Sequence, residues 1–367
     1  MGLAHRRCAS GCFEKDGGHG VFGRMQIRYA IAGMPIQHSL SPVLAALTAA
    51  HLNQAGLEVE ITEINLLESD DVTSPMAWAW VNKKRPQKEI SNRLYGDPTT
   101  PSSRGRLLEL SSKVLSEVKT AHSSHVPNGE TLVHRGDDRV KTRRGATESW
   151  ISLASPLKHL LSPRSGIHPL DDSLQNGSVN QLRWDGTHWY CAGTDGDGLL
   201  TIARHFGFDF DAEGVERPLL CMVGGGGSAR SCAGAWAQAG GVIWSIEGRR
   251  PLDKRGPWVE HLVDGDDVVD NIGMRLFIDF DISPARPESE RTTDADIHLI
   301  SSYNSEAVAS IVTPTESGLQ LDGRWLLAAQ HLEAWARLYS PEAAHLLPGL
   351  GLTMTRLEAM ESALRAD

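Results

Sequence analysis

The stretch Leu219-Leu-Cys-Met-Val-Gly-Gly-Gly-Gly-Ser-Ala-Arg230 joins a short, wholly apolar run to four consecutive glycines. An apolar run of this kind is expected for a parallel strand that is covered on both faces of its sheet. Small residues follow from Ser231 to Ala239, and Gly241-Val-Ile-Trp-Ser-Ile246 then has the composition of a second strand. The order strand, glycine turn, helix, strand predicts one β-α-β unit of a Rossmann-type domain.

The glycine turn of this unit predicts a dinucleotide site. Glycines let the backbone turn tightly and approach a pyrophosphate, and the N-terminus of the following helix offers free N–H groups to its oxygens. A turn that is merely flexible is the alternative interpretation. The candidate cofactor-binding residues are Gly224, Gly226, Gly227, Ser228, Ala229 and Arg230.

Charged residues directly after the second predicted strand bear on the choice of cofactor. Glu247 stands roughly 20 residues past the first glycine, where an acidic side chain can accept hydrogen bonds from a ribose, and this favours NAD. Arg249 and Arg250 follow at once, and a guanidinium can bind a ribose 2′-phosphate, which favours NADP. From these residues alone NAD, NADP and a plain solvated turn all stay open.

The front half of the chain has a second α/β pattern. Arg28-Tyr-Ala-Ile-Ala-Gly33 reads as a strand, Pro42 to Leu57 as an amphipathic helix, and Val59-Glu-Ile-Thr-Glu-Ile64 as another strand. A strand, a helix and a strand in succession predict a parallel sheet. The chain is therefore expected to be an α/β protein with a Rossmann-type dinucleotide-binding domain and a separate α/β substrate-binding domain.

The bulk composition fits two globular domains. The chain has 367 residues, 40% hydrophobic and 22% charged, and domains usually contain about 100–200 residues. The formal net charge of −10 argues against nucleic acid as the main ligand. No run approaches the roughly 18 apolar residues of a membrane span, and residues 1–24 lack the apolar core of a signal peptide, so we expect a cytoplasmic protein without a membrane partner.

The five cysteines do not suggest a metal centre. Cys191, Cys221 and Cys232 stand in apolar or glycine-rich surroundings that suit reduced, buried thiols. Cys8 and Cys12 have no second Cys or His pair that would complete a zinc site. We therefore expect no bound metal.

Residues 82–148 interrupt the α/β pattern with a basic segment, which holds 14 Lys and Arg against 8 Asp and Glu. It is rich in Ser, Thr, Gly, Pro and Arg, and helical apolar spacing occurs only from Arg106 to Lys119. We expect a largely flexible insert that costs little stability. Docking of an acidic partner is the functional alternative.

Six short motifs, in the order in which they occur, resemble those of shikimate dehydrogenases. Together they span about residues 27–81 and 149–350. They are Tyr29-Ala-Ile-Ala-Gly-Met-Pro-Ile-Gln-His-Ser-Leu-Ser-Pro42, Pro156-Leu-Lys158, Gly177-Ser-Val-Asn180, Thr194-Asp-Gly196, Gly224 to Arg230, and Leu327-Ala-Ala-Gln-His-Leu-Glu-Ala-Trp335. The resemblance implies a cytoplasmic enzyme that uses NADP, with NAD as an open alternative, to reduce 3-dehydroshikimate to shikimate reversibly in chorismate and aromatic amino-acid biosynthesis.

The resemblance also implies a role for individual residues. Lys158 and Asp195 would be the catalytic pair, and an ammonium beside a carboxylate can indeed move a proton and stabilise a developing alkoxide. Arg249 and Glu247 would lie at the adenosine end of the cofactor. The substrate would be bound by Ser39 and Ser41 at its carboxylate and by Asn180, Asp195, Tyr303 and Gln330 at its ring. As separate residues, the two serines could instead cap the helix at Pro42, and the others could be ordinary surface or turn residues.

Four departures from the family pattern keep alternatives open. The segment Ser152-Leu-Ala154 lacks the expected Thr hydroxyl, Gly193 replaces an Asn, Glu247-Gly-Arg249 replaces Asn-Arg-Thr, and Asp279-Phe-Asp281 brings two carboxylates close to a polyanionic cofactor. An NAD-dependent quinate/shikimate dehydrogenase is one alternative. A catalytically weak or inactive protein that binds shikimate is the other.

The expected organisation has four parts. Residues 1–26 form a tail and 27–195 the substrate-binding domain, including the insert. Residues 196–324 form the dinucleotide-binding domain, and 325–367 form helices that pack back on the substrate domain. A small molecule is the expected partner, and a homodimer is left open.

Overall fold

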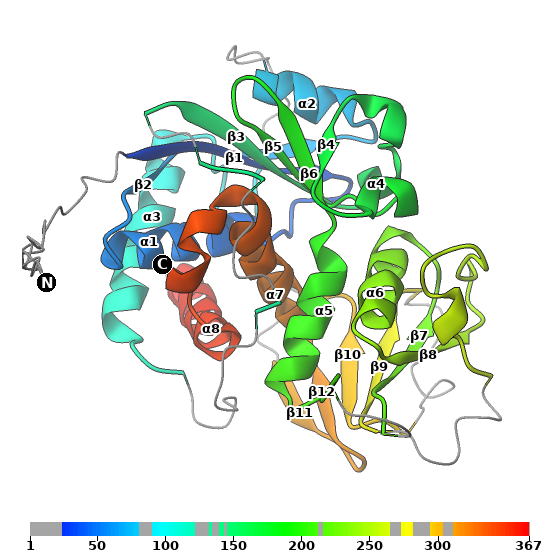
Figure 1. Cartoon of the computed structure of the whole chain (residues 1–367). Coiled ribbons are helices and arrows are strands. Elements are labelled where there is room, and N and C mark those ends of the chain that lie inside the picture. Colours follow the sequence, from blue (N-terminus) through cyan, green and yellow to red (C-terminus); the bar gives the residue numbers. More distant parts are fainter. Residues whose placement is uncertain are drawn as a thin grey trace, which may run out of the picture.

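Two six-stranded sheets, flanked by helices, make up the fold. The computed structural model describes residues 24–80, 90–121, 132–133, 139–142, 145–211, 216–264, 273–281, 294–303 and 311–366. One sheet is built by the front half of the chain and the other by the back half, with helix α5 (Thr194–His205) running between them (Figure 1). The α/β architecture expected from the sequence is confirmed.

The first sheet has the strand order β2-β1-β3-β5-β6-β4. The central strand β1 pairs in parallel with β2 and β3, as the front-half pattern predicts, while β5 runs antiparallel to both of its neighbours. Its strands are β1 (Met25–Gly33), β2 (Val59–Glu68), β3 (Thr147–Leu153), β4 (His168–Pro169), β5 (Gln181–Trp184) and β6 (Trp189–Ala192).

The second sheet has the strand order β11-β12-β10-β9-β7-β8 and is parallel except for β11. Strand β7 is buried at all five positions, which explains its continuous apolar run. Its strands are β7 (Leu219–Val223), β8 (Val242–Ile246), β9 (Arg275–Asp279), β10 (Ile297–Ile300), β11 (Val312–Pro314) and β12 (Leu319–Leu321). The predicted β-α-β unit of a Rossmann-type sheet is confirmed.

The helices cover the sheets on several sides. Helix α2 contacts β3 on the side of the first sheet away from α1, whereas α7 and α8 pack on α1 (Figure 1). The α-helices are α1 (Ser41–Gln54), α2 (Thr73–Trp80), α3 (Pro101–Glu117), α4 (Ser173–Asn176), α5, α6 (Gly227–Gln238), α7 (Arg324–Ala334) and α8 (Leu350–Ala366). Short turns of other helical types are η2 (Leu157–His159), η3 (Pro163–Ser165), η4 (Val259–His261), η7 (Trp335–Tyr339) and η8 (Pro341–Leu346).

The helical spacing expected in the insert from Arg106 to Lys119 corresponds to helix α3, which begins five residues earlier, at Pro101. Helix α3 buries Leu107, Val114 and Leu115 against α1 and α8. A narrow apolar stripe suffices for such packing. The end of the segment also belongs to the fold, because Glu148 lies in β3 and is completely buried. Residues 81–89, 122–131, 134–138 and 143–144 of this stretch, like the tail up to residue 23, lie outside the described residues.

A charged pair joins the two middle strands of the first sheet, β3 and β5. Arg183 of β5 donates two hydrogen bonds to Glu148, from Nε to Oε2 and from Nη2 to Oε1, each at 2.8 Å. The same guanidinium donates to the carbonyl oxygens of Leu338 and Lys141. Because both side chains are buried, each charge depends on the other for compensation.

The cysteines of the core are reduced. Cys191, Cys221 and Cys232 are unpaired and buried, as expected. Burial raises the pKa of each of these thiols.

None of the helices that the structure describes has both the length and the apolar character required to cross a membrane. The division of the chain at residues 195 and 324 stays a proposal.

Candidate active site

A cavity of about 170 Å³ lies where the first sheet, η2 and α7 meet. The structure brings six of the seven residues predicted for catalysis and substrate binding to its wall. These are Ser39, Ser41, Lys158, Asn180, Tyr303 and Gln330. They come from segments far apart in the sequence, so the cavity exists only in the folded chain.

The seventh residue, Asp195, lies directly behind this wall. Its Oδ2 accepts a hydrogen bond of 2.6 Å from Lys158 Nζ, and its Oδ1 accepts one of 3.0 Å from Asn180 Nδ2. The Lys158 side chain is 18% exposed and that of Asp195 is 2% exposed. The ammonium therefore faces the cavity while the carboxylate holds it from behind, an arrangement that can hold and transfer a proton at Nζ.

Asn180 fixes the position of Asp195 relative to the sheet. Its Oδ1 accepts a hydrogen bond of 2.7 Å from the backbone N–H of Thr194, at the first residue of α5. Its Nδ2 donates to Asp195 and, at 3.1 Å, to Gln330 Oε1. The amide thus joins β5, α5 and α7, and a small displacement of any one of them would move the Lys158–Asp195 pair.

The opposite end of the cavity is built around the start of α1. Ser39 Oγ accepts from the backbone N–H of Ser41 at 3.2 Å, and Tyr303 Oη accepts from that of Leu40 at 3.1 Å. The backbone oxygen of Ser39 accepts from Tyr95 Oη, so the described part of the insert holds this turn. Hydroxyl groups at a helix N-terminus form a suitable environment for a carboxylate.

The environment of Tyr303 differs from that of an ordinary surface tyrosine. Burial raises the pKa of Tyr303 to about 12, so the phenol is protonated and able to donate a hydrogen bond at neutral pH. The resemblance places Tyr303 at the substrate ring, whereas the structure places it at the start of α1, beside Ser39. No group of three or more His, Cys, Asp and Glu side chains in the described part of the chain is arranged to hold a metal ion.

Several polar residues of the cavity were not predicted. Ser152 and Gln181 line the wall, and behind them a buried series of hydrogen bonds runs from Tyr29 Oη to Ser152 (2.8 Å), to Gln181 Oε1 (2.9 Å) and to Tyr339 Oη (2.7 Å). Strand alternation around Ser152 could have indicated an inward-facing hydroxyl, whereas Gln181 carries no signal in the sequence. His331, next to Gln330 on α7, also lines the cavity.

The glycine turn lies against the same lysine. Lys158 Nζ donates a second hydrogen bond to Ser228 Oγ at 2.9 Å, and a Cβ added at Gly227 would lie only 3.1 Å from Lys158 Cβ. Gly224 has a φ of +98°, which favours glycine, and α6 begins at Gly227 with Gly226 as its N-cap. The glycine turn and the N-terminus of α6 therefore lie beside Lys158, and backbone N–H groups at such a position are suited to a pyrophosphate.

The side chains of two predicted cofactor residues, Ala229 and Arg230, are not directed to a cofactor in this structure: one is buried and the other is hydrogen bonded to the backbone. Ala229 is completely buried, so only its backbone can reach a ligand. Arg230 Nη2 donates to the backbone oxygen of Gly177 at 2.9 Å and so ties the first turn of α6 to the front half of the chain.

The adenosine end of the proposed cofactor site is acidic. Glu247 and Arg249 are exposed just after β8. The carboxylate of Asp281 accepts a hydrogen bond from the backbone N–H of Arg249, and a Cβ added at Gly224 would lie 3.1 Å from its Oδ1. The Asp281 carboxylate thus lies between the glycine turn and the turn after β8. The residues fit a dinucleotide pyrophosphate, but they fit a ribose 2′-phosphate poorly.

Helix α5, which bears Asp195, packs very closely against both α6 and α7. A Cβ added at Gly196 would lie 2.2 Å from the backbone oxygen of Ser231 on α6, and one added at Gly198 would lie 2.7 Å from the backbone nitrogen of Gln330 on α7. Only glycine permits this approach. The two glycines therefore set how far Asp195 stands from both helices.

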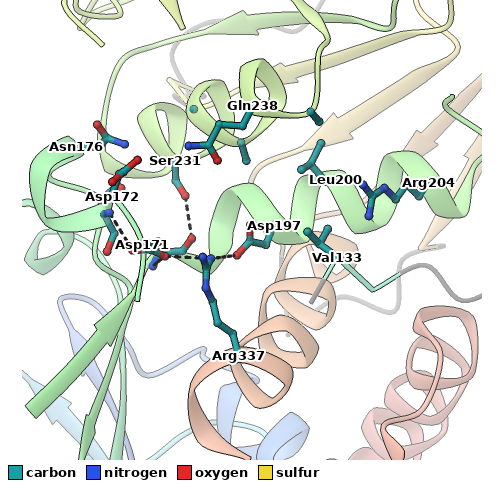
Figure 2. Close-up of a pocket in the computed structure, with 16 residues that line it drawn as sticks. Val133, Asp171, Asp172, Asn176, Asp197, Leu200, Arg204, Ser231, Gln238 and Arg337 are labelled. Atoms are coloured by element: carbon teal, nitrogen blue, oxygen red, sulfur yellow. Dashed lines mark hydrogen bonds and ion pairs between the residues drawn. The ribbon is translucent and has the colours of Figure 1, made fainter. Parts of the chain in front are cut away.

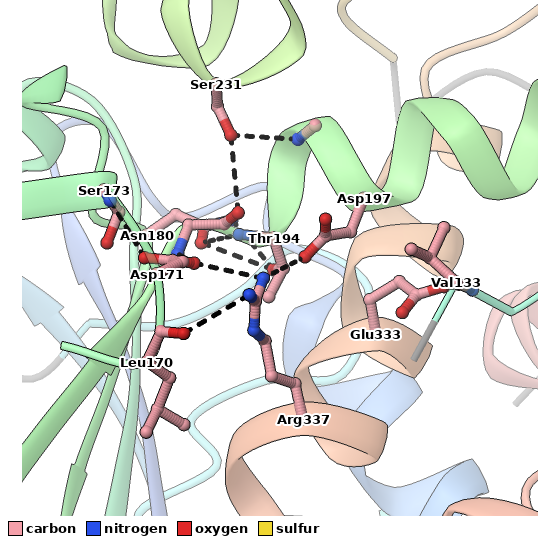
Figure 3. Close-up of polar contacts among 12 residues, drawn as sticks. Val133, Leu170, Asp171, Ser173, Asn180, Thr194, Asp197, Ser231, Glu333 and Arg337 are labelled. Atoms are coloured by element: carbon pink, nitrogen blue, oxygen red, sulfur yellow. Dashed lines mark hydrogen bonds and ion pairs between the residues drawn. The ribbon is translucent and has the colours of Figure 1, made fainter. Parts of the chain in front are cut away.

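A second cavity, of about 380 Å³, lies between α5, α6 and the loop before α4 (Figure 2). Arg337 reaches into it, and its Nη1 lies 2.6 Å from Asp197 Oδ2 and 3.2 Å from Asp171 Oδ2 (Figure 3). Asp171 also accepts from the backbone N–H of Gly193, just before α5. Because the guanidinium is compensated by two carboxylates, we interpret this cluster as a clamp that holds α5.

Comparison with known proteins supports the fold. No family model matches the sequence, and no curated protein matches it. Among solved structures, the dehydroquinate dehydratase and shikimate dehydrogenase protein of S. pombe has a TM-score of 0.50 at 13% identity, covering 91% of this chain and 53% of that chain. Shikimate 5-dehydrogenase of Thermus thermophilus in complex with shikimate gives 0.49 at 18% identity, covering 92% and 99%.

The shikimate dehydrogenase of Aquifex aeolicus is a further similar structure, with a TM-score of 0.48 at 15% identity over 90% of this chain and 97% of that chain. The match to the S. pombe protein, at 13% identity, supports the α/β architecture alone and says nothing about chemistry.

Proposed function

We propose that this protein is a nicotinamide-dependent dehydrogenase that interconverts a ring alcohol and a ring ketone of a small cyclic carboxylic acid, with shikimate and 3-dehydroshikimate as the pair. The observation that carries the proposal is the position of Lys158 Nζ. It bonds to Asp195 and to Ser228 of the glycine turn, and it lines the cavity that contains Ser39 and Tyr303. A substrate carboxylate held by these two hydroxyl groups would direct its ring towards the lysine.

The residues of the cavity can perform the proton transfer of this reaction. Bound nicotinamide dinucleotide would supply the hydride. Lys158 Nζ can donate a proton to the oxygen of the ketone as the alcohol forms, and its charge stabilises the oxygen while negative charge develops. Asp195 orients the ammonium through its hydrogen bond, while Asn180 and Gln330 are positioned to hold ring hydroxyls. In the oxidative direction the lysine accepts the proton again.

An NAD-linked quinate/shikimate dehydrogenase is the second candidate. The resemblance to shikimate dehydrogenases and Arg249 favour NADP. The Asp281 carboxylate beside the Arg249 backbone and the exposed Glu247 favour NAD, since a 2′-phosphate there would meet like charges. As a shikimate dehydrogenase the protein would act in the cytoplasm on the route to chorismate and aromatic amino acids.

Steady-state assays with shikimate and quinate, each offered NAD and NADP, test the proposal. We expect oxidation of at least one of these acids with at least one cofactor. The Lys158→Ala variant should lose turnover by at least about 100-fold while keeping its fold, which far-ultraviolet circular dichroism checks. Lys254→Ala, at an exposed lysine, is the matched control and should behave like the wild type.

Two results would contradict the proposal. Unchanged turnover of the Lys158→Ala variant would remove the assigned proton donor. Calorimetric binding of shikimate by a protein that has no affinity for either nicotinamide cofactor would instead favour the catalytically inactive binding protein.

A further inference from the structure

His331 is a buried histidine without a hydrogen-bond partner. It is 1% exposed, and within the described residues neither Nδ1 nor Nε2 has a partner. Its ring lies 6.3 Å from that of Tyr29, centroid to centroid, at an interplanar angle of 52°. Burial lowers the pKa of His331 to about 3, so its imidazole is neutral and carries one donor and one acceptor nitrogen.

A half-buried histidine of the same protein has partners for both of its nitrogens. His51 Nε2 lies 3.0 Å from the backbone oxygen of Leu346, and its Nδ1 lies 2.9 Å from Arg356 Nη1. A buried polar atom without a partner costs folding free energy, so proteins rarely retain one unless a ligand or a water satisfies it. The contrast singles out His331 as a group whose partner is not part of the fold.

The polar groups around His331 are engaged with one another. Tyr29 Oη bonds to Ser152, Gln181 Oε1 accepts from both Ser152 and Tyr339, and Gln330 Oε1 accepts from Asn180. His331 itself lines the cavity next to Gln330.

We propose that His331 is a substrate-binding residue that hydrogen bonds to a ring hydroxyl of the cyclic acid and thereby selects polyhydroxylated rings. This inference rests on the proposed function. A hydroxyl group both donates and accepts a hydrogen bond, as a neutral imidazole does, so the two are complementary in either tautomer. The substrate carboxylate is assigned to the other end of the cavity, at Ser39 and Tyr303, which leaves the α7 wall to the ring substituents.

The His331→Phe variant tests the role, because it keeps a ring of similar size and removes both nitrogens. We expect the KM for shikimate to rise about tenfold with kcat changed by less than about twofold, since the lost contact is made to bound substrate and transition state alike. The melting temperature should not fall, because two unsatisfied buried atoms are removed. A histidine with a purely structural role would instead lose stability and leave KM unchanged.

His205→Phe is the matched control. His205 is also buried, at 3% exposure, and its ring contacts those of Phe206 (edge to face) and Trp325 (tilted), but it does not line the cavity. Its KM should equal that of the wild type. Shikimate analogues that each lack one ring hydroxyl identify the contact. For the analogue without the hydroxyl bound by His331, wild type and His331→Phe should have the same KM.

The outcomes separate this inference from the proposed function. Wild-type turnover together with an unchanged KM in His331→Phe overturns the role of His331 alone. A wild type that neither binds nor oxidises shikimate or quinate overturns the proposed function and this inference with it. If His331→Phe does not fold, nitrogen-15 NMR of the wild-type histidines decides. Added shikimate should shift the His331 ring resonances, and unchanged resonances in a protein saturated with shikimate overturn the inference.

Discussion

Replacing Gly196 with alanine should separate two helices at the candidate active site. The new Cβ would lie 2.2 Å from the backbone oxygen of Ser231 and 2.7 Å from Ala235 Cβ, whereas carbon contacts ordinarily begin near about 3.5 Å. Helices α5 and α6 must therefore move apart by roughly 1 Å. Overpacking of this kind typically costs about 1–3 kcal/mol, while alanine in a helix gains about 1 kcal/mol over glycine. Because a rigid backbone atom is struck, we expect a net loss of about 2 kcal/mol.

The same displacement should impair turnover, since Asp195 is the adjacent residue and its bond to Lys158 is 2.6 Å long. A misplacement of about 1 Å can lower a rate by about 100-fold. Urea unfolding followed by circular dichroism measures the stability, and a steady-state assay with shikimate measures the rate. Gly105→Ala on α3 is the matched control, because no atom lies within 4 Å of its added Cβ, and it should be more stable by up to about 1 kcal/mol. A Gly196→Ala protein as stable and as active as the wild type would refute the reasoning.

Three further predictions concern ionisable side chains. Asp281→Asn should raise kcat/KM with NADP relative to NAD roughly tenfold, because one like charge near the 2′-phosphate is removed; an unchanged ratio would count against a cofactor role for Asp281. Glu148→Ala should lower the unfolding free energy in urea by about 3–5 kcal/mol, because the buried Arg183 loses its counter-charge; a loss below about 1 kcal/mol would contradict this. Because His331 has a pKa of about 3 in the fold and 6.5 as its ordinary value, the unfolded chain binds the extra proton, and stability should fall by about 1.4 kcal/mol per pH unit below pH 6.5. His331→Phe should lose that part of the acid sensitivity in urea titrations at pH 4.5 and 6.5, and an identical pH dependence would disprove it.

Local patterns in the sequence predicted those elements whose structure depends on near neighbours. The strand Leu219–Val223 is found at its predicted bounds, and β8 differs by one residue. Helix α6 begins four residues earlier than predicted, because Gly227 to Arg230 complete its first turn. The sequence analysis assigned these four residues to the loop because the segment begins with glycines. Ser228, Ala229 and Arg230 nevertheless accept helical geometry, and Lys158 holds this end of the helix through Ser228.

Contacts between distant segments could not be predicted. The pairing of Arg183 with Glu148 and the packing of α3 depend on which strands become neighbours, and a single sequence does not state this. Six of the seven residues expected for substrate binding and catalysis line one cavity, and Asp195 lies behind its wall, because the resemblance carried information about contacts between distant segments. His331 was overlooked because a histidine on an apolar helix face looks like any core residue until its partners are examined.

Two hydrogen bonds beside the glycine turn connect the front and back halves of this molecule. Lys158 reaches Ser228, and Arg230 reaches the backbone of Gly177, so two cationic side chains cross the gap within a single helical turn of α6. A back half expressed alone would carry the Arg230 cation without its acceptor and would expose the apolar flank of α5. The two halves, produced separately, should therefore fold poorly. Engineering of either half has to preserve the Lys158–Ser228 and Arg230–Gly177 hydrogen bonds.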